Sequence, residues 1–131
     1  MIETVYLENY KCYGPNGAKF DLKPLTFLYG TNGAGKSTFL DGVLRLKEWE
    51  RSKKEEVWLS ADDVFKKDDT LTVGIGVTLS TDSGPIKLFK RTAAKQREWV
   101  IVSDKIEPLL EGSARKQALN DFLNMRHMRA S

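Results

Sequence analysis

A complete glycine-rich phosphate-binding pattern constrains this chain more than any other feature. Gly30, Gly35, Lys36 and Ser37 fill the fixed positions of G-x-x-x-x-G-K-[ST]. The glycines let successive backbone N–H groups approach phosphate oxygens, and the lysine supplies a point charge for the β- and γ-phosphates. The serine hydroxyl is the Mg²⁺ ligand that such loops provide. The pattern therefore predicts binding of a nucleoside triphosphate together with Mg²⁺.

The segments on both sides of the loop have the predicted secondary structure that this pattern requires. Residues 25–29 form a compact apolar run that predicts a buried strand. After the loop, apolar residues recur at helical spacing and predict a helix that runs at least to Trp49. The order strand, glycine loop, helix also points the positive end of the helix dipole at the bound anion. This context disfavours the alternative of a glycine-rich turn with an incidental Lys-Ser pair.

The other segments predict strands that surround one further helix. An opening strand at residues 5–10 and a short return strand at residues 19–22 come first. Residues 71–79 alternate between apolar and small or polar side chains, which is typical of a strand with one buried face. On its other face, Gly74 and Gly76 indicate that something packs closely.

Short connections then join this strand to two more, which predicts an antiparallel meander. We expect one lobe over residues 1–131, with a nucleotide-binding part at 1–56, the meander at 70–103 and a C-terminal helix at 113–126. A short helical segment is expected near residues 60–65, where Ser60 resembles an N-cap. The mixed-charge stretch at residues 48–56 favours a solvated helix end or loop over a functional surface.

The charge distribution gives a weaker indication of a partner. The net charge is +3, which is compatible with a nearby nucleic acid without requiring one. One short stretch gathers the basic residues that are candidates for DNA contact: Lys87, Lys90, Arg91, Lys95 and Arg97. A charged strand edge that blocks sheet aggregation explains the same stretch equally well. The lone cysteine excludes an internal disulfide, and no apolar run is long enough to span a membrane, so we expect a cytoplasmic protein.

Residues that complete a catalytic site are harder to find. Asp82 and Asp104 each follow an apolar run, as a second Mg²⁺-binding carboxylate should. Both are better explained as hairpin strands that end in a polar turn. No credible general base emerges, so the catalytic residues stay unknown.

The opening strand and the loop together resemble a specific family. Residues 5–13 and 25–41 look like the N-terminal lobe of the RecF and SMC type of ABC-like ATPase. That group includes chromosome-maintenance and DNA-repair ATPases and the ATPases of OLD-type and other anti-phage systems. The resemblance implies an α/β fold, namely a P-loop NTPase N-terminal lobe with an antiparallel β-meander layer and flanking helices.

The resemblance also implies roles for individual residues, with ATP and Mg²⁺ as cofactors. Lys11 matches a basic residue that reaches toward the phosphates in relatives, although a solvent-exposed lysine at a strand end remains an alternative. Ser37 would bind the metal. The residues that would wrap the phosphates are Asn32, Gly33, Ala34, Gly35, Lys36, Ser37 and Thr38.

The sequence departs from the family after its first lobe. A Gln loop, a signature motif, a Walker B Asp-Glu strand and a switch histidine are not found. We therefore expect an incomplete ATPase whose hydrolysis needs a missing C-terminal lobe or a second ATPase head, with DNA and an associated nuclease as further candidate partners. One alternative is a non-catalytic interaction or regulatory module with a structural P-loop. A small kinase or GTPase is disfavoured because no Asn/Thr-Lys-x-Asp motif is present.

Overall fold

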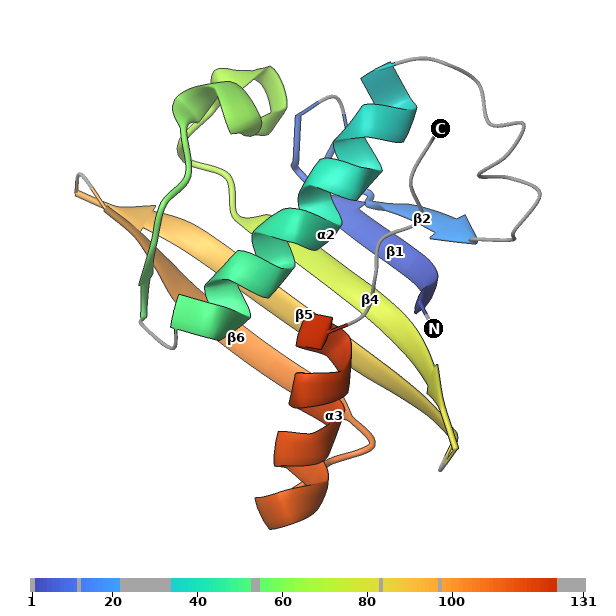
Figure 1. The fold of residues 1–131 in the computed structure, drawn as a ribbon. Helices are drawn as coiled ribbons and strands as arrows, with labels where there is room; N and C mark the ends of the chain where they lie inside the picture. The colour runs from blue at the N-terminus through green and yellow to red at the C-terminus, as the bar shows by residue number, and fades with distance from the viewer. Residues whose placement is uncertain are drawn as a thin grey trace.

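A six-stranded antiparallel sheet organises the described part of the chain (Figure 1). The structure is a computed structural model that describes residues 2–11, 13–21, 34–52, 55–82, 84–96 and 98–124. The strands lie in the order β2-β1-β4-β5-β6-β3. Their bounds are β1 Ile2–Glu8, β2 Ala18–Asp21, β3 Glu56–Val57, β4 Val73–Thr81, β5 Gly84–Lys95 and β6 Glu98–Glu107.

The predicted meander is confirmed as β4, β5 and β6, but its last strand extends past the expected end of the meander. β5 continues to Lys95 and β6 to Glu107, which lies beyond the boundary expected at residue 103. Charged residues interrupt the apolar pattern of both strands although the hydrogen-bonded pairing continues. The opening strand β1 joins the meander by pairing with β4, and β2 pairs with β1 on its other side. The predicted strand at residues 25–29 lies outside the described residues.

Two helices cover the same face of the sheet (Figure 1). α2 spans Ala34–Ser52 and α3 spans Gly112–Asn124, close to the helices that the sequence predicts. α2 buries Val43, Leu46 and Trp49, whereas α3 buries Ala118 and Phe122. The core therefore lies between these helices and the sheet. We call the opposite side of the sheet, where the structure describes no helix, the open face.

A glycine brings α2 close to the sheet. A Cβ atom at Gly42 would lie 2.6 Å from Cδ2 of Leu7 on β1, which is well inside van der Waals contact. Leu7 is fully buried, so its side chain has little room to move aside. The missing side chain at position 42 thus sets the short separation between α2 and β1.

The two glycines of β4 perform a similar role on the open face. A Cβ at Gly74 would meet the Phe89 ring at 2.8 Å, and one at Gly76 would meet it at 2.9 Å. The expectation that something packs closely against these glycines is confirmed, and the packing group is the aromatic ring of the neighbouring strand β5.

The connection between β3 and β4 contains two short 3₁₀ helices, η1 (Ala61–Asp63) and η2 (Phe65–Lys67). Ser60 and Asp63 form a capping box, in which each side chain accepts a hydrogen bond from the backbone N–H at the other end of the turn. The helical segment expected from the Ser60 N-cap is therefore confirmed, in 3₁₀ form.

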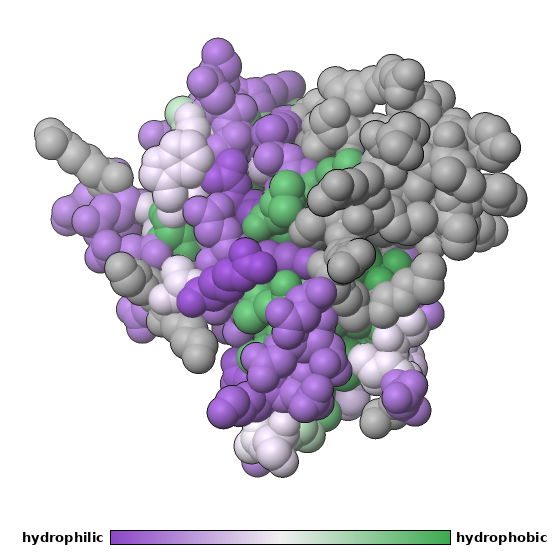
Figure 2. Space-filling view, in the orientation of Figure 1, coloured by the Kyte–Doolittle hydropathy of each residue, from purple (hydrophilic) through white to green (hydrophobic). Residues whose placement is uncertain are grey.

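The surface on the helix side is largely polar. Figure 2 shows mostly hydrophilic residues on the outside of α3 and hydrophobic residues in the seam beside α2. Within the described ranges, neither helix is long and apolar enough to cross a bilayer.

Candidate functional site

The predicted phosphate loop falls at the start of α2. Asn32 and Gly33 lie outside the described residues, as do Gly30 and Thr31. Ala34 begins the helix, and Gly35, Lys36, Ser37 and Thr38 follow in its first turns, where the structure describes the backbone. Because the first N–H groups of a helix have no intrahelical acceptor and carry partial positive charge, this backbone suits an anion.

Lys11 lies against the same helix. Its backbone has a left-handed conformation (φ 51°), and its N–H donates to the Asp63 carbonyl at 2.7 Å. The Lys11 ammonium is 3.1 Å from the Asp41 carboxylate on α2, and its side chain is 35% exposed. Asp41 stands seven residues after Ala34, which places it about 10 Å along the helix axis from the first residue. Lys11 therefore has an ion-pair partner on α2 while part of its side chain stays exposed, and contact with a phosphate stays a prediction.

Asp41 also accepts a hydrogen bond from the fully buried Tyr10 hydroxyl. Burial raises the pKa of Tyr10, and the neighbouring Asp41 carboxylate raises it further. Burial also raises the pKa of the Asp41 carboxyl, but the bonds from Tyr10 and Lys11 outweigh it and hold that pKa below its usual range. Asp41 is thus an anion with two donors, and sequence reasoning missed it.

A second ion pair fixes the loop that carries these groups. Arg45, one turn after Asp41, lies 3.3 Å from the Asp63 carboxylate, and both side chains are nearly buried at 11% and 12% exposure. Tyr10 forms a β-bridge with Val64. The segment around Asp63 therefore holds the end of β1 against α2, and it sets where Lys11 stands.

The five basic residues proposed for DNA contact do not form one surface. Lys90 faces the helices and is only 6% exposed, while Lys87 and Arg91 lie on the open face. Arg91 is occupied by a two-point ion pair with Glu8, with N···O distances of 2.8 and 2.9 Å. Lys95 is exposed at the end of the β5–β6 hairpin, and Arg97 lies outside the described residues. Interpreting Lys90 as a surface contact is wrong because alternation along β5 turns its side chain inward.

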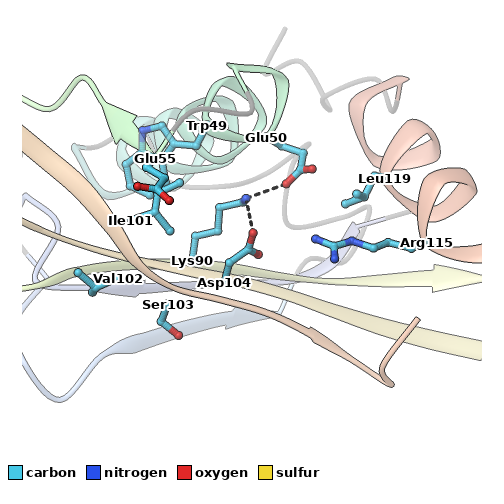
Figure 3. Close-up of a pocket in the computed structure, with 10 residues that line it drawn as sticks. All are labelled: Trp49, Glu50, Glu55, Lys90, Ile101, Val102, Ser103, Asp104, Arg115 and Leu119. Atoms are coloured by element: carbon cyan, nitrogen blue, oxygen red, sulfur yellow. Dashed lines mark hydrogen bonds and ion pairs between the residues drawn. The ribbon is translucent and has the colours of Figure 1, made fainter. Parts of the chain in front are cut away.

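Lys90 is instead the centre of a charge cluster beside a cavity of about 530 Å³ (Figure 3). Its ammonium lies 2.8 Å from a Glu50 oxygen and 3.0 Å from an Asp104 oxygen. Glu50 comes from the last turns of α2 and Asp104 from β6, so the cluster joins the end of that helix to the sheet. The expectation of a solvated helix end fails at Glu50, whose side chain is only 12% exposed.

The two carboxylates considered for the metal site do not meet in the structure. Asp104 lies inside β6 and binds Lys90, so the interpretation that it ends a strand is wrong. Asp82 stands in the turn between β4 and β5, as expected. Among the described residues, no cluster of three or more His, Cys, Asp or Glu side chains is arranged to hold a metal ion.

The buried tyrosine gives the fold a pH dependence that can be measured. Because the folded pKa of Tyr10 lies above the unfolded value of 10.0, unfolded chains lose this proton first as the pH rises. We expect the stability to be fully present below pH 10.0 and to fall above it, by up to about 1.4 kcal/mol per pH unit. Urea unfolding near pH 8 and near pH 11 measures this slope.

Tyr10→Phe is the matched variant for that measurement. It loses the bond to Asp41 and should be less stable near neutral pH, yet it should show a smaller decline above pH 10.0. Equal alkaline slopes in both proteins would contradict the assignment to Tyr10.

Comparisons with known proteins agree with this arrangement. A family model described as AAA ATPase domain matches residues 1–127. One similar solved chain belongs to a structure described as "Structural biochemistry of ATP-driven dimerization and DNA stimulated activation of SMC ATPases". It is 16% identical, with a TM-score of 0.60, over 95% of this chain and 80% of that chain, so the likeness concerns the fold. No curated protein matches the sequence.

Proposed function

This chain belongs to the AAA ATPase domain family, and we propose that it is the ATP-binding lobe of an SMC/RecF-like ATPase that acts on or near DNA. One observation carries the proposal. The glycine loop runs directly into α2, whose first turn starts at Ala34 and whose body packs against the sheet. A fixed helix with its N-terminus at the loop keeps the donors of the loop in place for phosphate.

The residues of the loop have separate roles in this proposal. Residues 32–38 wrap the β- and γ-phosphates with their backbone N–H groups, and Lys36 neutralises phosphate charge. The Ser37 hydroxyl holds Mg²⁺, which neutralises the charge that develops on the phosphates during transfer. The helix start within the loop and the hydroxyl two positions beyond Gly35 both fit this pair of cofactors.

Lys11 is the second cation of this site. Its ammonium is bound to Asp41, and the two side chains are 35% and 38% exposed, so neither is locked in the core. A triphosphate carries more charge than one carboxylate and attracts the ammonium more strongly. Lys11 therefore moves from Asp41 toward the phosphates when ATP binds.

Hydrolysis in this proposal depends on groups from a second lobe or a second head. The positions of the two carboxylates that the sequence offered as a second Mg²⁺ ligand support this dependence. Asp104 is bound to Lys90, and Asp82 lies in a turn. The similar SMC structure is described in terms of ATP-driven dimerization and DNA-stimulated activation of SMC ATPases. We transfer that behaviour to this chain, so that Gly30 to Thr38 form one half of a shared ATP site.

Phosphate release by the purified chain tests whether hydrolysis depends on a second lobe or head. At saturating ATP and Mg²⁺, we expect no steady turnover above the level of a Lys36→Ala variant, because the proposal assigns the water-activating groups to the second lobe or head. Sustained release that Lys36→Ala abolishes would contradict the need for a second lobe. If a folded chain fails to bind ATP at all, the P-loop is structural and the non-catalytic alternative holds.

The DNA part of the proposal concerns the open face. Lys87 is exposed there, and Lys95 is exposed at the hairpin end of the same strand, whereas buried Lys90 is no longer a candidate for contact. Binding through such residues should weaken as salt rises, because phosphate contacts release counterions.

A further inference from the structure

Among the described residues, some basic side chains form ion pairs with carboxylates and others do not. Lys11, Arg45, Lys90 and Arg91 each have a carboxylate partner. In contrast, besides Lys95 at the hairpin end of β5, three exposed lysines of the sheet have side chains that make no ion pair or hydrogen bond with any described residue: Lys19 on β2, Lys87 on β5 and Lys105 on β6. All three project from the open face, as the strand registers require. The free positive charge of the sheet is therefore concentrated on one side.

The register places an aromatic pair between two of these lysines. Tyr6 lies opposite both Lys19 and Gly76, and Phe89 lies opposite both Gly76 and Lys105. One row thus crosses five strands in the order Lys19, Tyr6, Gly76, Phe89, Lys105. With strands 4.7–4.9 Å apart, the row is about 19 Å long. The Tyr6 and Phe89 rings have centroids 5.7 Å apart and are tilted by 57°, so they present faces in two directions.

A hollow of about 250 Å³ opens beside this pair on the same face. Thr4 and Thr78 contribute hydroxyl groups to its lining, and Lys19 and Lys87 stand over it from opposite sides. Gly76 lacks a side chain, so the Phe89 ring packs directly over it and forms one wall of the hollow. The hollow combines an aromatic wall, hydroxyl groups that donate or accept, and two ammonium groups.

The close packing of Phe89 against Gly74 and Gly76 explains why one edge of its ring lies on β4. It does not explain why exposed lysines stand beside the ring. Arg91 lies 5.1 Å from the same ring, yet Glu8 holds its guanidinium and neutralises it. Two further acidic residues of the face, Asp21 and Glu107, stand at the two ends of the next row, which contains Thr4, Thr78 and Lys87. A polyanion therefore finds its most favourable path along the Lys19–Lys105 row.

We infer that the open face binds single-stranded nucleic acid across this row, with a base stacked against Tyr6 or Phe89 in the hollow and backbone phosphates at Lys19, Lys87 and Lys105. The inference deepens the DNA part of the proposed function and rests on it. Base stacking on exposed aromatic side chains of a sheet, next to lysines that follow the backbone, is how many proteins hold single strands. A duplex hides its base faces and can use the lysines alone.

Fluorescence anisotropy with a labelled single-stranded oligothymidine and a duplex of the same length tests this inference. The wild-type chain should prefer the single strand. Phe89→Leu keeps an apolar cover over Gly74 and Gly76 but removes the ring, and we expect a loss of about 5- to 150-fold in single-strand affinity. Tyr6→Leu should lose affinity over the same range, whereas Tyr6→Phe keeps the ring and should stay within about twofold.

The charged residues provide a second, independent set of variants. Lys19→Ala and Lys87→Ala should each weaken binding and reduce its salt dependence, by about 0.7 in the slope of log affinity against log salt. Lys116→Ala, on the exposed side of α3, should leave binding unchanged. Asp21→Asn should strengthen binding because it removes a negative charge from the face. Circular dichroism of each variant checks that the fold is kept.

The outcomes distinguish this inference from the proposals on which it rests. Equal affinity for the duplex, together with unchanged binding by Phe89→Leu, would overturn the single-strand inference and leave DNA contact standing. Binding of neither probe would overturn both the inference and the DNA part of the proposed function. ATP binding by the same samples tests the nucleotide part separately, since the open face lies on the side of the sheet away from α2.

Discussion

Replacing Lys90 with alanine is expected to lower the free energy of unfolding by about 3–5 kcal/mol. The side chain is 8% exposed and is the shared partner of Glu50 and Asp104. Alanine would leave two carboxylates close together, one of them nearly buried, without the cation that compensates both. Removing one partner of a buried charge group costs far more than an exposed ion pair contributes.

Urea denaturation of two variants from the same strand measures this effect. Lys87→Ala removes an exposed lysine three residues earlier on β5 and should change stability by less than about 0.5 kcal/mol. A triple variant, Glu50→Gln, Lys90→Met and Asp104→Asn, removes all three charges and should recover much of the lost stability. Similar losses in Lys90→Ala and Lys87→Ala would show that Lys90 is not the anchor of α2.

The Lys90 charge cluster also affects the nucleotide site, because it fixes the helix that begins in the phosphate loop. α2 begins in the phosphate loop and carries Glu50 of the charge cluster in its last turn, so one helix joins the two sites. Lys11 and Asp41 hold its first half to the end of β1, and Lys90 holds its second half to β5 and β6. The helix is thereby fixed against the sheet at both ends before any ligand arrives.

Local patterns predicted the backbone of this lobe well. Alternation at residues 71–79 identified β4, and helical spacing after the loop identified α2, because burial on one face leaves a regular imprint on the sequence. The close packing at Gly74 and Gly76 also followed from local chemistry. The family resemblance of residues 5–13 and 25–41 agrees with the AAA ATPase match and with the SMC-like fold.

Charged residues inside strands were where the sequence interpretation failed. Lys90 and Arg91 were interpreted as parts of one basic stretch, whereas β5 runs through both residues and places them on opposite faces of the sheet. Continuing the alternation of Ile86 and Leu88 by one step would have turned Lys90 inward. Its partners could not be predicted, because Glu50 is distant in the sequence and Asp104 belongs to the next strand.

Asp41 was missed for a related reason. A single aspartate on a helix usually faces solvent, and nothing local indicates that Tyr10 and Lys11 will meet it. The position of Asp41, one helical turn after the phosphate loop, was the one indication in the sequence that it belongs to the site. A single sequence does not predict such long-range contacts, because they depend on how β1 packs against α2.

ATP affinity is expected to fall by about 10- to 150-fold when Lys36 is replaced with alanine. A hydrogen bond between charged groups contributes about 1.5–3 kcal/mol, and Lys36 is the loop residue whose charge meets the β- and γ-phosphates. Lys116→Ala is the matched control, because it removes an exposed lysine from α3 and leaves the loop intact. Lys11→Ala should produce a smaller loss, since Asp41 competes for its ammonium.

Isothermal titration of the chain with ATP in the presence of Mg²⁺ tests the ATP-binding proposal most directly. We predict saturable binding by the wild type and by Lys116→Ala, and the stated loss in Lys36→Ala with an unchanged circular dichroism spectrum. Equal binding by the wild type and Lys36→Ala, or no binding by a folded wild-type chain, would contradict the proposal that residues 30–38 form an ATP site.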